Sequence, residues 1–183
     1  MVVGSFASSY WGCRRTTHDA DLLVDIPLSK VPDLATLLEA SFYAPDFAML
    51  DAVERHDHFS AIHVERAFKV DFWLRTDARY DLERFSRRRH GSILGRRTWV
   101  SSAEDTILIK LVWHREFAGV GPRLLDAIGV YEVQAGRRDQ CYLDRWAGEL
   151  GLDDLLREVR SFASHTATAP AQLAMRGAPW NDK

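Results

Sequence analysis

The segment from Val2 to Asp25, VVGSFASSYWGCRRTTHDADLLVD, constrains the fold of this chain more than any other stretch. A short apolar run leads into Gly4 and Ser5, which predicts a strand followed by a turn of small residues. Alternating polar side chains then predict a second strand, because successive residues of a strand point to opposite faces. One face of this second strand would carry Arg15, Thr17, Asp19 and Asp21.

Asp19 and Asp21 are candidate metal ligands. Two carboxylates on one strand face repel each other unless a cation lies between them, and Mg²⁺ prefers oxygen ligands. A third carboxylate, Asp71, interrupts the apolar segment Phe68–Leu74, which predicts a buried strand. Because a buried, unpaired carboxylate is costly, we expect Asp71 to have a cationic partner. The alternative for Asp19 and Asp21 is a polar strand end that faces water.

Gly4 and Ser5 are candidate phosphate-binding residues, because a Gly-Ser turn leaves backbone N–H groups and a hydroxyl free to approach phosphate oxygens. Together with the thirteen residues that separate Ser5 from Asp19, and with the sequence Asp19-Ala20-Asp21-Leu22, they resemble the signature of the nucleotidyltransferase superfamily. This superfamily has the DNA-polymerase-beta-like fold. Asp71 matches the third carboxylate of that family.

The resemblance implies a metal-dependent nucleotidyltransferase. Such an enzyme moves an NMP group from an NTP to a hydroxyl acceptor and releases pyrophosphate. Asp19, Asp21 and Asp71 would bind Mg²⁺ or Mn²⁺, and Asp71 would also help to take the proton of the acceptor. Gly4 and Ser5 would hold the β- and γ-phosphates. The polar residues Arg15 and Thr17 of the second strand would lie in the nucleotide site, where either Arg15 or Lys110 would neutralise the triphosphate.

A helix is predicted after Ser101-Ser102-Ala103-Glu104, which has a capping-box pattern. The segment from Ser102 to Leu111, S-x-E-D-x-x-L-x-K-L, resembles bacterial minimal nucleotidyltransferases, including relatives of abortive-infection toxins. In those proteins the helix lysine faces the active site and a later Asp supports it, which implies that Lys110 contacts the nucleotide phosphates beside Asp126. A lone lysine on an amphipathic helix would otherwise be a surface residue.

The order of periodic segments predicts an α+β fold, in which a small mixed sheet is backed by helices. We expect a nucleotidyltransferase core in residues 1–100, a C-terminal helical subdomain in residues 101–163 and a loosely ordered tail in residues 164–183. In the core we predict a helix over Val31–Phe42 and strands over Met49–Val53, Phe59–Val64 and Phe68–Leu74. In the subdomain we predict further helices over Leu124–Gln134, Tyr142–Leu150 and Leu152–Phe162.

Two further patterns leave alternatives open. His56 and His58, with His63 nearby, could bind zinc or another transition metal, or could form a solvated hairpin. The basic stretch Tyr80–Arg97 opens with a predicted short helix. Its arginines could form a solvated face or could bind polyphosphate or RNA.

The composition excludes several classes of protein. A net charge of −2 gives no global attraction to nucleic acid, and the two cysteines, Cys13 and Cys141, indicate neither a disulfide framework nor a zinc knuckle. The sequence shows no membrane span and no signal peptide, so we expect a cytoplasmic protein. The chain starts at the Gly-Ser strand, without the helix that often precedes it in the family. Either a longer natural reading frame supplies that helix, or its absence exposes a sheet face and favours a homodimer.

Two rival functions remain beside the nucleotidyltransferase. A nucleotide-binding or antitoxin-type regulatory module would keep the fold without turnover, although the intact Asp19, Asp21 and Asp71 argue against it. A metal-dependent phosphohydrolase would use water as the nucleophile. The acceptor stays open between an RNA end, a protein side chain and a small molecule, and so does the base of the NTP.

Overall fold

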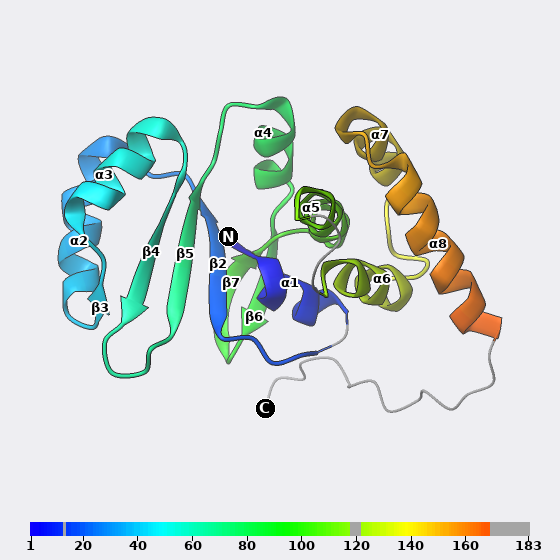
Figure 1. Ribbon diagram of the computed structural model, residues 1–183, viewed down its shortest axis with the longest axis horizontal. Coiled ribbons are helices and arrows are strands. Elements are labelled where there is room, and N and C mark those ends of the chain that lie inside the picture. Colours follow the sequence, from blue (N-terminus) through cyan, green and yellow to red (C-terminus); the bar gives the residue numbers. More distant parts are fainter. Residues whose placement is uncertain (13, 118–121, 169–183) are drawn as a thin grey trace.

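The computed structural model describes residues 1–12, 14–117 and 122–168 of the chain. The elements follow in the order β1 (Val2–Val3), α1 (Gly4–Trp11), β2 (Asp19–Val24), η1 (Leu28–Lys30), α2 (Val31–Glu39), β3 (Phe42–Tyr43), α3 (Asp46–Arg55), β4 (His58–His63), β5 (Lys69–Leu74), α4 (Arg79–Ser86), β6 (Arg89–Ile93), β7 (Arg96–Val100), α5 (Ala103–Glu116), α6 (Arg123–Val133), α7 (Gln140–Leu150) and α8 (Asp153–Thr168). Figure 1 shows an α+β arrangement, in which a twisted sheet lies between the helices α2 and α3 on one side and a larger group of helices, α5 to α8, on the other.

The described strands form one seven-stranded mixed sheet in the order β3-β4-β5-β2-β1-β7-β6. Strand β2 lies at its centre, parallel to β5 and antiparallel to β1. Strand β1 also pairs in parallel with β7, whose hairpin partner β6 is one edge of the sheet. The mixed sheet predicted from the sequence is therefore confirmed, and its two strands with acidic residues are direct neighbours.

Alternation along β5 separates an apolar face from a polar one. Phe72 and Leu74 are buried in a core with residues of α2, α3 and β4, including Met49 and Phe59. Because side chains of a strand alternate, Lys69, Asp71 and Trp73 point to the opposite face. In β2, Leu22 and Val24 pack on the same apolar core, so the acidic side chains of β2 share the polar face with Asp71.

A second core joins the helices α5 to α8. Leu108, Leu111, Leu143, Trp146 and Leu156 are among its buried side chains. Helix α5 begins with Ser102 as its N-cap, whose hydroxyl accepts a hydrogen bond from the backbone N–H of Asp105. The capping box predicted from Ser101 to Glu104 is therefore displaced by one residue, to Ser102 and Asp105. Helix α7 ends at Gly151, which has the left-handed conformation that suits glycine.

Several predicted local structures differ from the observed ones. The expected turn after Gly4 is helix α1, and strand β2 begins only at Asp19, so Arg15 and Thr17 precede it. The predicted strand Met49–Val53 lies within helix α3. Its apolar residues suggested a strand, but Met49 and Ala52 are three apart and both are buried on one face of the helix, which Pro45 precedes.

The C-terminal helix α8 continues to Thr168, beyond the residue at which we expected the tail to begin. The rest of the predicted tail, residues 169–183, lies outside the described residues, as does Cys13. Cys141 is exposed and free. None of the described helices has the length and apolar character that crossing a bilayer would require.

Replacing Leu108 by Ala tests the helical core, because Leu108 is 0% exposed among residues of α5, α6 and α7. We expect a loss of about 2–5 kcal/mol in the free energy of unfolding, measured by urea denaturation. Leu125→Ala is the matched control, since Leu125 is 70% exposed on α6 and its loss should change stability by about 0.5 kcal/mol or less. Similar losses for both variants would contradict this packing.

Candidate functional site

Asp19, Asp21 and Asp71 lie on one face of the sheet. In the parallel pair of β2 and β5, Asp21 is opposite Asp71 and Asp19 is opposite Lys69. Neighbouring strands lie about 4.8 Å apart, and paired residues of parallel strands point to the same side. The three carboxylates that the sequence singled out are therefore brought together, from two adjacent strands.

Asp71 has the cationic partner that its burial requires. Only 6% of Asp71 is exposed, and its Oδ2 lies 2.7 Å from Nζ of Lys69, two residues earlier on the same strand. The hydroxyl of Ser60 on β4 donates a hydrogen bond of 2.6 Å to Asp71 Oδ1. The pKa of Lys69 is raised, mainly by its hydrogen bond to Asp71. The expected cation is thus a lysine of the same chain.

Asp21 is electrostatically coupled to both other carboxylates. Burial raises the pKa of Asp21, an indole hydrogen bond of 3.2 Å from Trp73 opposes this shift, and the charges of Asp19 and Asp71 raise the pKa further. Asp19 accepts a hydrogen bond of 2.7 Å from the hydroxyl of Thr17. Negative charge is therefore concentrated on this face, and a cation there would relieve the repulsion.

Gly4 lies against the carboxylate of Asp21, at the start of helix α1. Its φ of +60° belongs to the left-handed region, and a Cβ added at this position would collide with Asp21 Oδ2. A side chain is therefore excluded by both the backbone conformation and the space. The glycine lets the N-terminus of α1, where helix dipoles favour anions, approach the acidic strand closely.

The second half of the site is a cluster of cations around Ser5. The guanidinium of Arg15 donates a hydrogen bond of 2.6 Å to Ser5 Oγ and two more, of 2.9 and 3.0 Å, to the carboxylate of Asp126 on α6. Lys110 Nζ lies 2.7 Å from Asp126 Oδ2 and 3.5 Å from Ser5 Oγ. The sequence places Ser5, Arg15, Lys110 and Asp126 up to 121 positions apart, and the fold joins them at the first turn of α1.

Lys110 is a buried lysine, since only 3% of it is exposed. Burial lowers the pKa of Lys110, and the charge and hydrogen bond of Asp126 oppose this shift. The charge of Asp21 also raises the pKa of Lys110, against the effect of burial. The alternative prediction, that Lys110 is a surface residue of an amphipathic helix, is therefore wrong.

The carboxylate face suits a hard divalent cation in its donor chemistry. Its three carboxylates repel one another, and an ammonium group, that of Lys69, already compensates one of them. Among the described residues, however, no three side chains of the His, Cys, Asp or Glu type are close enough together to form a ready-made metal site. A metal on Asp71 would have to displace the Lys69 ammonium and draw the carboxylates together.

The three histidines do not converge. The ring of His56 contacts the carbonyl of Arg75, while His58 contacts Asp57 and stacks on Trp73. The ring of His63 accepts a hydrogen bond from the backbone N–H of Glu65. In the part of the chain described, they belong to no metal-binding group.

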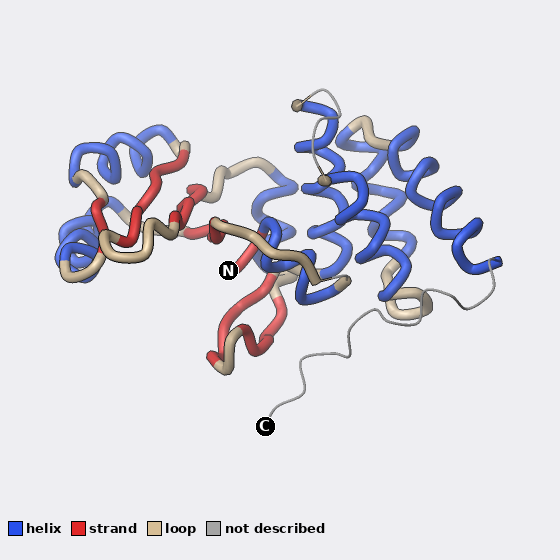
Figure 2. Tube along the Cα trace, turned by 60° about the horizontal axis from the view of Figure 1, so that its bottom comes forward, coloured by secondary structure: helices blue, strands red, loops and turns tan. Residues whose placement is uncertain are grey.

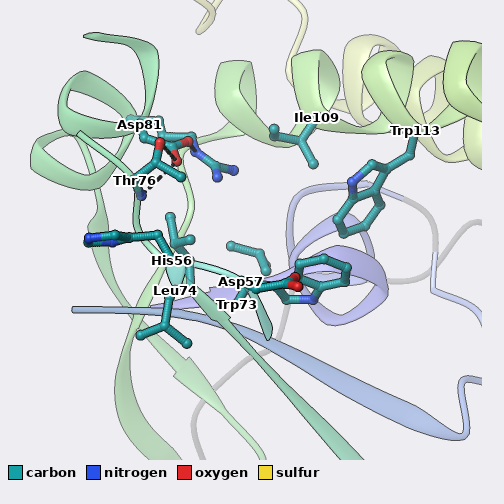
Figure 3. A pocket seen from close by; sticks show the side chains of 11 residues that line it. His56, Asp57, Trp73, Leu74, Thr76, Asp81, Ile109 and Trp113 are labelled. Carbon is teal, nitrogen blue, oxygen red and sulfur yellow. Dashed lines mark hydrogen bonds and ion pairs between the residues drawn. The ribbon is translucent and has the colours of Figure 1, made fainter. Parts of the chain in front are cut away.

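A cavity of about 230 Å³ opens beside Trp73. Figure 3 shows Trp73 of β5 with Ile109 and Trp113 of α5 at one side, and Thr76 with Asp81 at the other. The rings of Trp73 and Trp113 are 5.9 Å apart and inclined by 40°. Because Trp73 also donates to Asp21, a ligand in this cavity would touch the same indole that supports the carboxylate face.

Sequence reasoning missed Lys69, Ser60, Trp73 and Trp113. Lys69 and Trp73 could have been found, because each lies two residues from Asp71 on a predicted strand and so shares its face. Ser60 depends on the antiparallel register of β4 and β5, which places it opposite Asp71. Trp113 depends on the rotation of α5 over the sheet, for which the sequence offers no signal.

Replacing Gly4 by Ala tests the close approach of α1 to Asp21. The variant should lose about 1–3 kcal/mol from the left-handed backbone alone, and more from the collision with the carboxylate. Gly136→Ala is the matched control, because Gly136 also has a positive φ, +75°, yet has no atom within 4 Å of the added Cβ. Urea denaturation should therefore show the larger loss for Gly4→Ala. Equal losses would contradict the contact with Asp21.

The pH dependence of Asp21→Asn tests the coupling of the carboxylates. The pKa of Asp21 is raised above its ordinary value of 3.8 in the folded state. The folded protein therefore ionises this carboxyl less readily than the unfolded chain does, and its stability falls as the pH rises from 3.8 through the folded pKa. Asp21→Asn removes that cost, so the variant should be more stable than the unmodified protein at pH 7, and the gain should shrink towards pH 4. Thermal unfolding between pH 4 and pH 8 measures this. Destabilisation at pH 7 would refute the coupling.

No family model matches this chain, and no curated protein matches it. Three carboxylates on one sheet face lie beside a glycine-started helix, and two cations held by one aspartate meet its first turn.

Proposed function

We propose that this chain is a nucleotidyltransferase of the DNA-polymerase-beta-like superfamily, which transfers an NMP group from an NTP to a hydroxyl acceptor. The observation that carries the proposal is the register of β2 and β5, which sets Asp21 beside Asp71 on the face that Gly4 approaches. Without that register the carboxylates could not act on one phosphate.

The triphosphate binds at the first turn of α1. Backbone N–H groups at a helix N-terminus favour phosphate, and the hydroxyl of Ser5 stands next to two cations, Arg15 and Lys110. Arg15 offers a planar fork that matches phosphate oxygens, and Lys110 supplies a compact charge. Asp126 binds both cations, so it is a positioning residue that keeps them aimed at Ser5.

Asp19, Asp21 and Asp71 would hold Mg²⁺ or Mn²⁺. When bound, such ions neutralise the charge that builds up on the attacking and leaving oxygens of a phosphoryl transfer. The acceptor oxygen forms a bond to the α-phosphorus while the bond to the pyrophosphate oxygen breaks. The carboxylate of Asp71 takes the proton of the acceptor hydroxyl, and Lys110 and Arg15 stabilise the charge on the departing pyrophosphate.

The cavity beside Trp73 and Trp113 offers room for a flat group, either the base of the NTP or part of the acceptor. The cavity does not distinguish between the three candidate acceptors, which are an RNA end, a protein side chain and a small molecule. We place the reaction in the cytoplasm, where NTPs and Mg²⁺ are present together.

A second candidate is the regulatory module without turnover, and one observation favours it. The Lys69 ammonium is bound to Asp71, as a resident cation would be in a protein that needs no metal. In that case the Ser5 cluster binds nucleotide and the carboxylate face stays closed.

The decisive experiment supplies the protein with Mg²⁺, NTPs labelled at the α-phosphate, and bulk RNA or cell lysate. Transfer of label should fall by at least about a hundredfold in Asp19→Asn and in Asp71→Asn, because each removes a metal-binding carboxylate or the proton acceptor. Asp154→Asn, a change of the same kind at an exposed surface pair with Arg157, should leave transfer unchanged.

Other outcomes identify the rivals. Tight binding of NTP in a calorimetric titration, without labelled product on any acceptor, would support the silent module and overturn the transferase. Release of NMP or free phosphate in the absence of an acceptor would support the phosphohydrolase.

A further inference from the structure

The hairpin of β6 and β7, Arg89–Val100, is the most basic surface element of the described chain and has no part in the proposed catalysis. Residues 84–100 contain six arginines and neither Asp nor Glu, although the whole chain has a net charge of −2. This segment therefore carries a local excess of positive charge. Strand β6 is an edge of the sheet, and the hairpin projects from the body of the molecule in the view of Figure 2.

Three arginines of this hairpin, Arg89, Arg96 and Arg97, are exposed. Within residues 1–12, 14–117 and 122–168 these three arginines form no ion pair, whereas Arg84 and Arg87, earlier in the same basic stretch, are each bound to a carboxylate. A surface that only needed to stay solvated would gain from mixed charges, whereas this one presents a single sign.

Aromatic groups accompany these charges. The rings of His90 and Trp99 stack across the two strands with their centroids 3.5 Å apart, and the guanidinium of Arg88 lies 4.8 Å from the Trp99 ring. Trp99 is 38% exposed and His90 is exposed. The register places Arg97 on the same face as these rings, while Arg89 and Arg96 point to the other face.

We propose that the basic hairpin Arg89–Val100 binds single-stranded nucleic acid. A strand that wraps over the free edge of β6 meets both faces of the hairpin, so that Arg89, Arg96 and Arg97 contact its phosphates and a base stacks on the His90–Trp99 pair. Arginine forks match phosphate oxygens, and stacking requires bases that are unpaired. An acidic protein segment would satisfy the charges but would leave the exposed rings without a partner.

Binding is measured without NTP and without divalent cation, so the result does not depend on the proposed transferase activity. The probe is a fluorescein-labelled oligouridylate of twelve nucleotides, followed by fluorescence anisotropy between 50 and 200 mM KCl. The test variant Arg89→Ala/Arg96→Ala/Arg97→Ala should bind at least about tenfold more weakly at 100 mM KCl, with a log–log salt slope lower by about 2. The same three positions changed to Lys should keep most of the affinity.

The matched control removes three exposed arginines elsewhere, Arg55→Ala/Arg66→Ala/Arg157→Ala, and so changes the net charge equally. It should bind within about threefold of the unmodified protein. His90→Ala, at an exposed position, should weaken binding at least about fivefold and leave the salt slope unchanged, because it removes a stacking surface and no phosphate contact.

Four results would overturn the proposal: no binding of the oligouridylate by the unmodified protein, an equal loss in the control variant, tighter binding of a duplex of the same length, or equally tight binding of a polyglutamate of the same charge. The last result would identify an acidic protein partner instead. Circular dichroism of each variant confirms that a loss of binding is not a loss of fold.

Discussion

Parallel pairing of β2 with β5 sets Asp21 beside Asp71, and the rest of the proposed site depends on this register. The pairing is not held by the polar face, where like charges oppose it. It is held from the other side, where Phe72 and Leu74 pack under α2 and α3 with Leu22 and Val24. A slip of one residue would turn Phe72 towards the polar face and Asp71 into the apolar core. The hydrophobic core therefore fixes the chemistry on the face that it does not touch.

The polar face separates charge into two groups that meet at the start of α1. Carboxylates lie along β2 and β5, while Arg15 and Lys110 surround Ser5. Asp126 keeps the two cations together, although like charges would otherwise part them. Lys69 acts in the opposite sense, since it compensates Asp71 among the carboxylates. Each group thus contains one residue of the opposite charge: Lys69 among the carboxylates and Asp126 between the two cations. These residues reduce the repulsion within each group, so the fold can keep a net negative charge on one group and a net positive charge on the other.

The sequence predicted the residues of this face better than it predicted the local backbone. Spacing along a strand was enough for Asp19 and Asp21, because alternation is a local property, and Asp71 stood out as the one charge inside the apolar segment Phe68–Leu74 apart from Lys69. The α+β class and most helices followed from the same periodicities. Met49–Val53 was predicted wrongly, because a short apolar run fits a strand as well as a helix face. Arg15 reaches Ser5 from a loop, so its role required the tertiary fold.

Helix α5 contributes to both the Ser5 cluster and the cavity beside Trp73. It can do so only if its rotation about its own axis is fixed. Lys110 points to Ser5 and Asp126, whereas Ile109 and Trp113 border the cavity beside Trp73. Apolar packing alone specifies rotation poorly, because it is non-directional and α5 is buried on several sides.

Directional hydrogen bonds at the start of α5 supply what packing does not. Ser102 and Asp105 bind each other reciprocally, and the hydroxyl of Tyr142 on α7 donates to Asp105 at 2.6 Å. Burial raises the pKa of Asp105, and these hydrogen bonds oppose that shift, so they favour the ionised carboxylate in the core. A rotated helix would leave this carboxylate unsatisfied, which is costly in a buried site. The polar network in the helical core therefore determines where Lys110 points, one and a half turns further along the same helix.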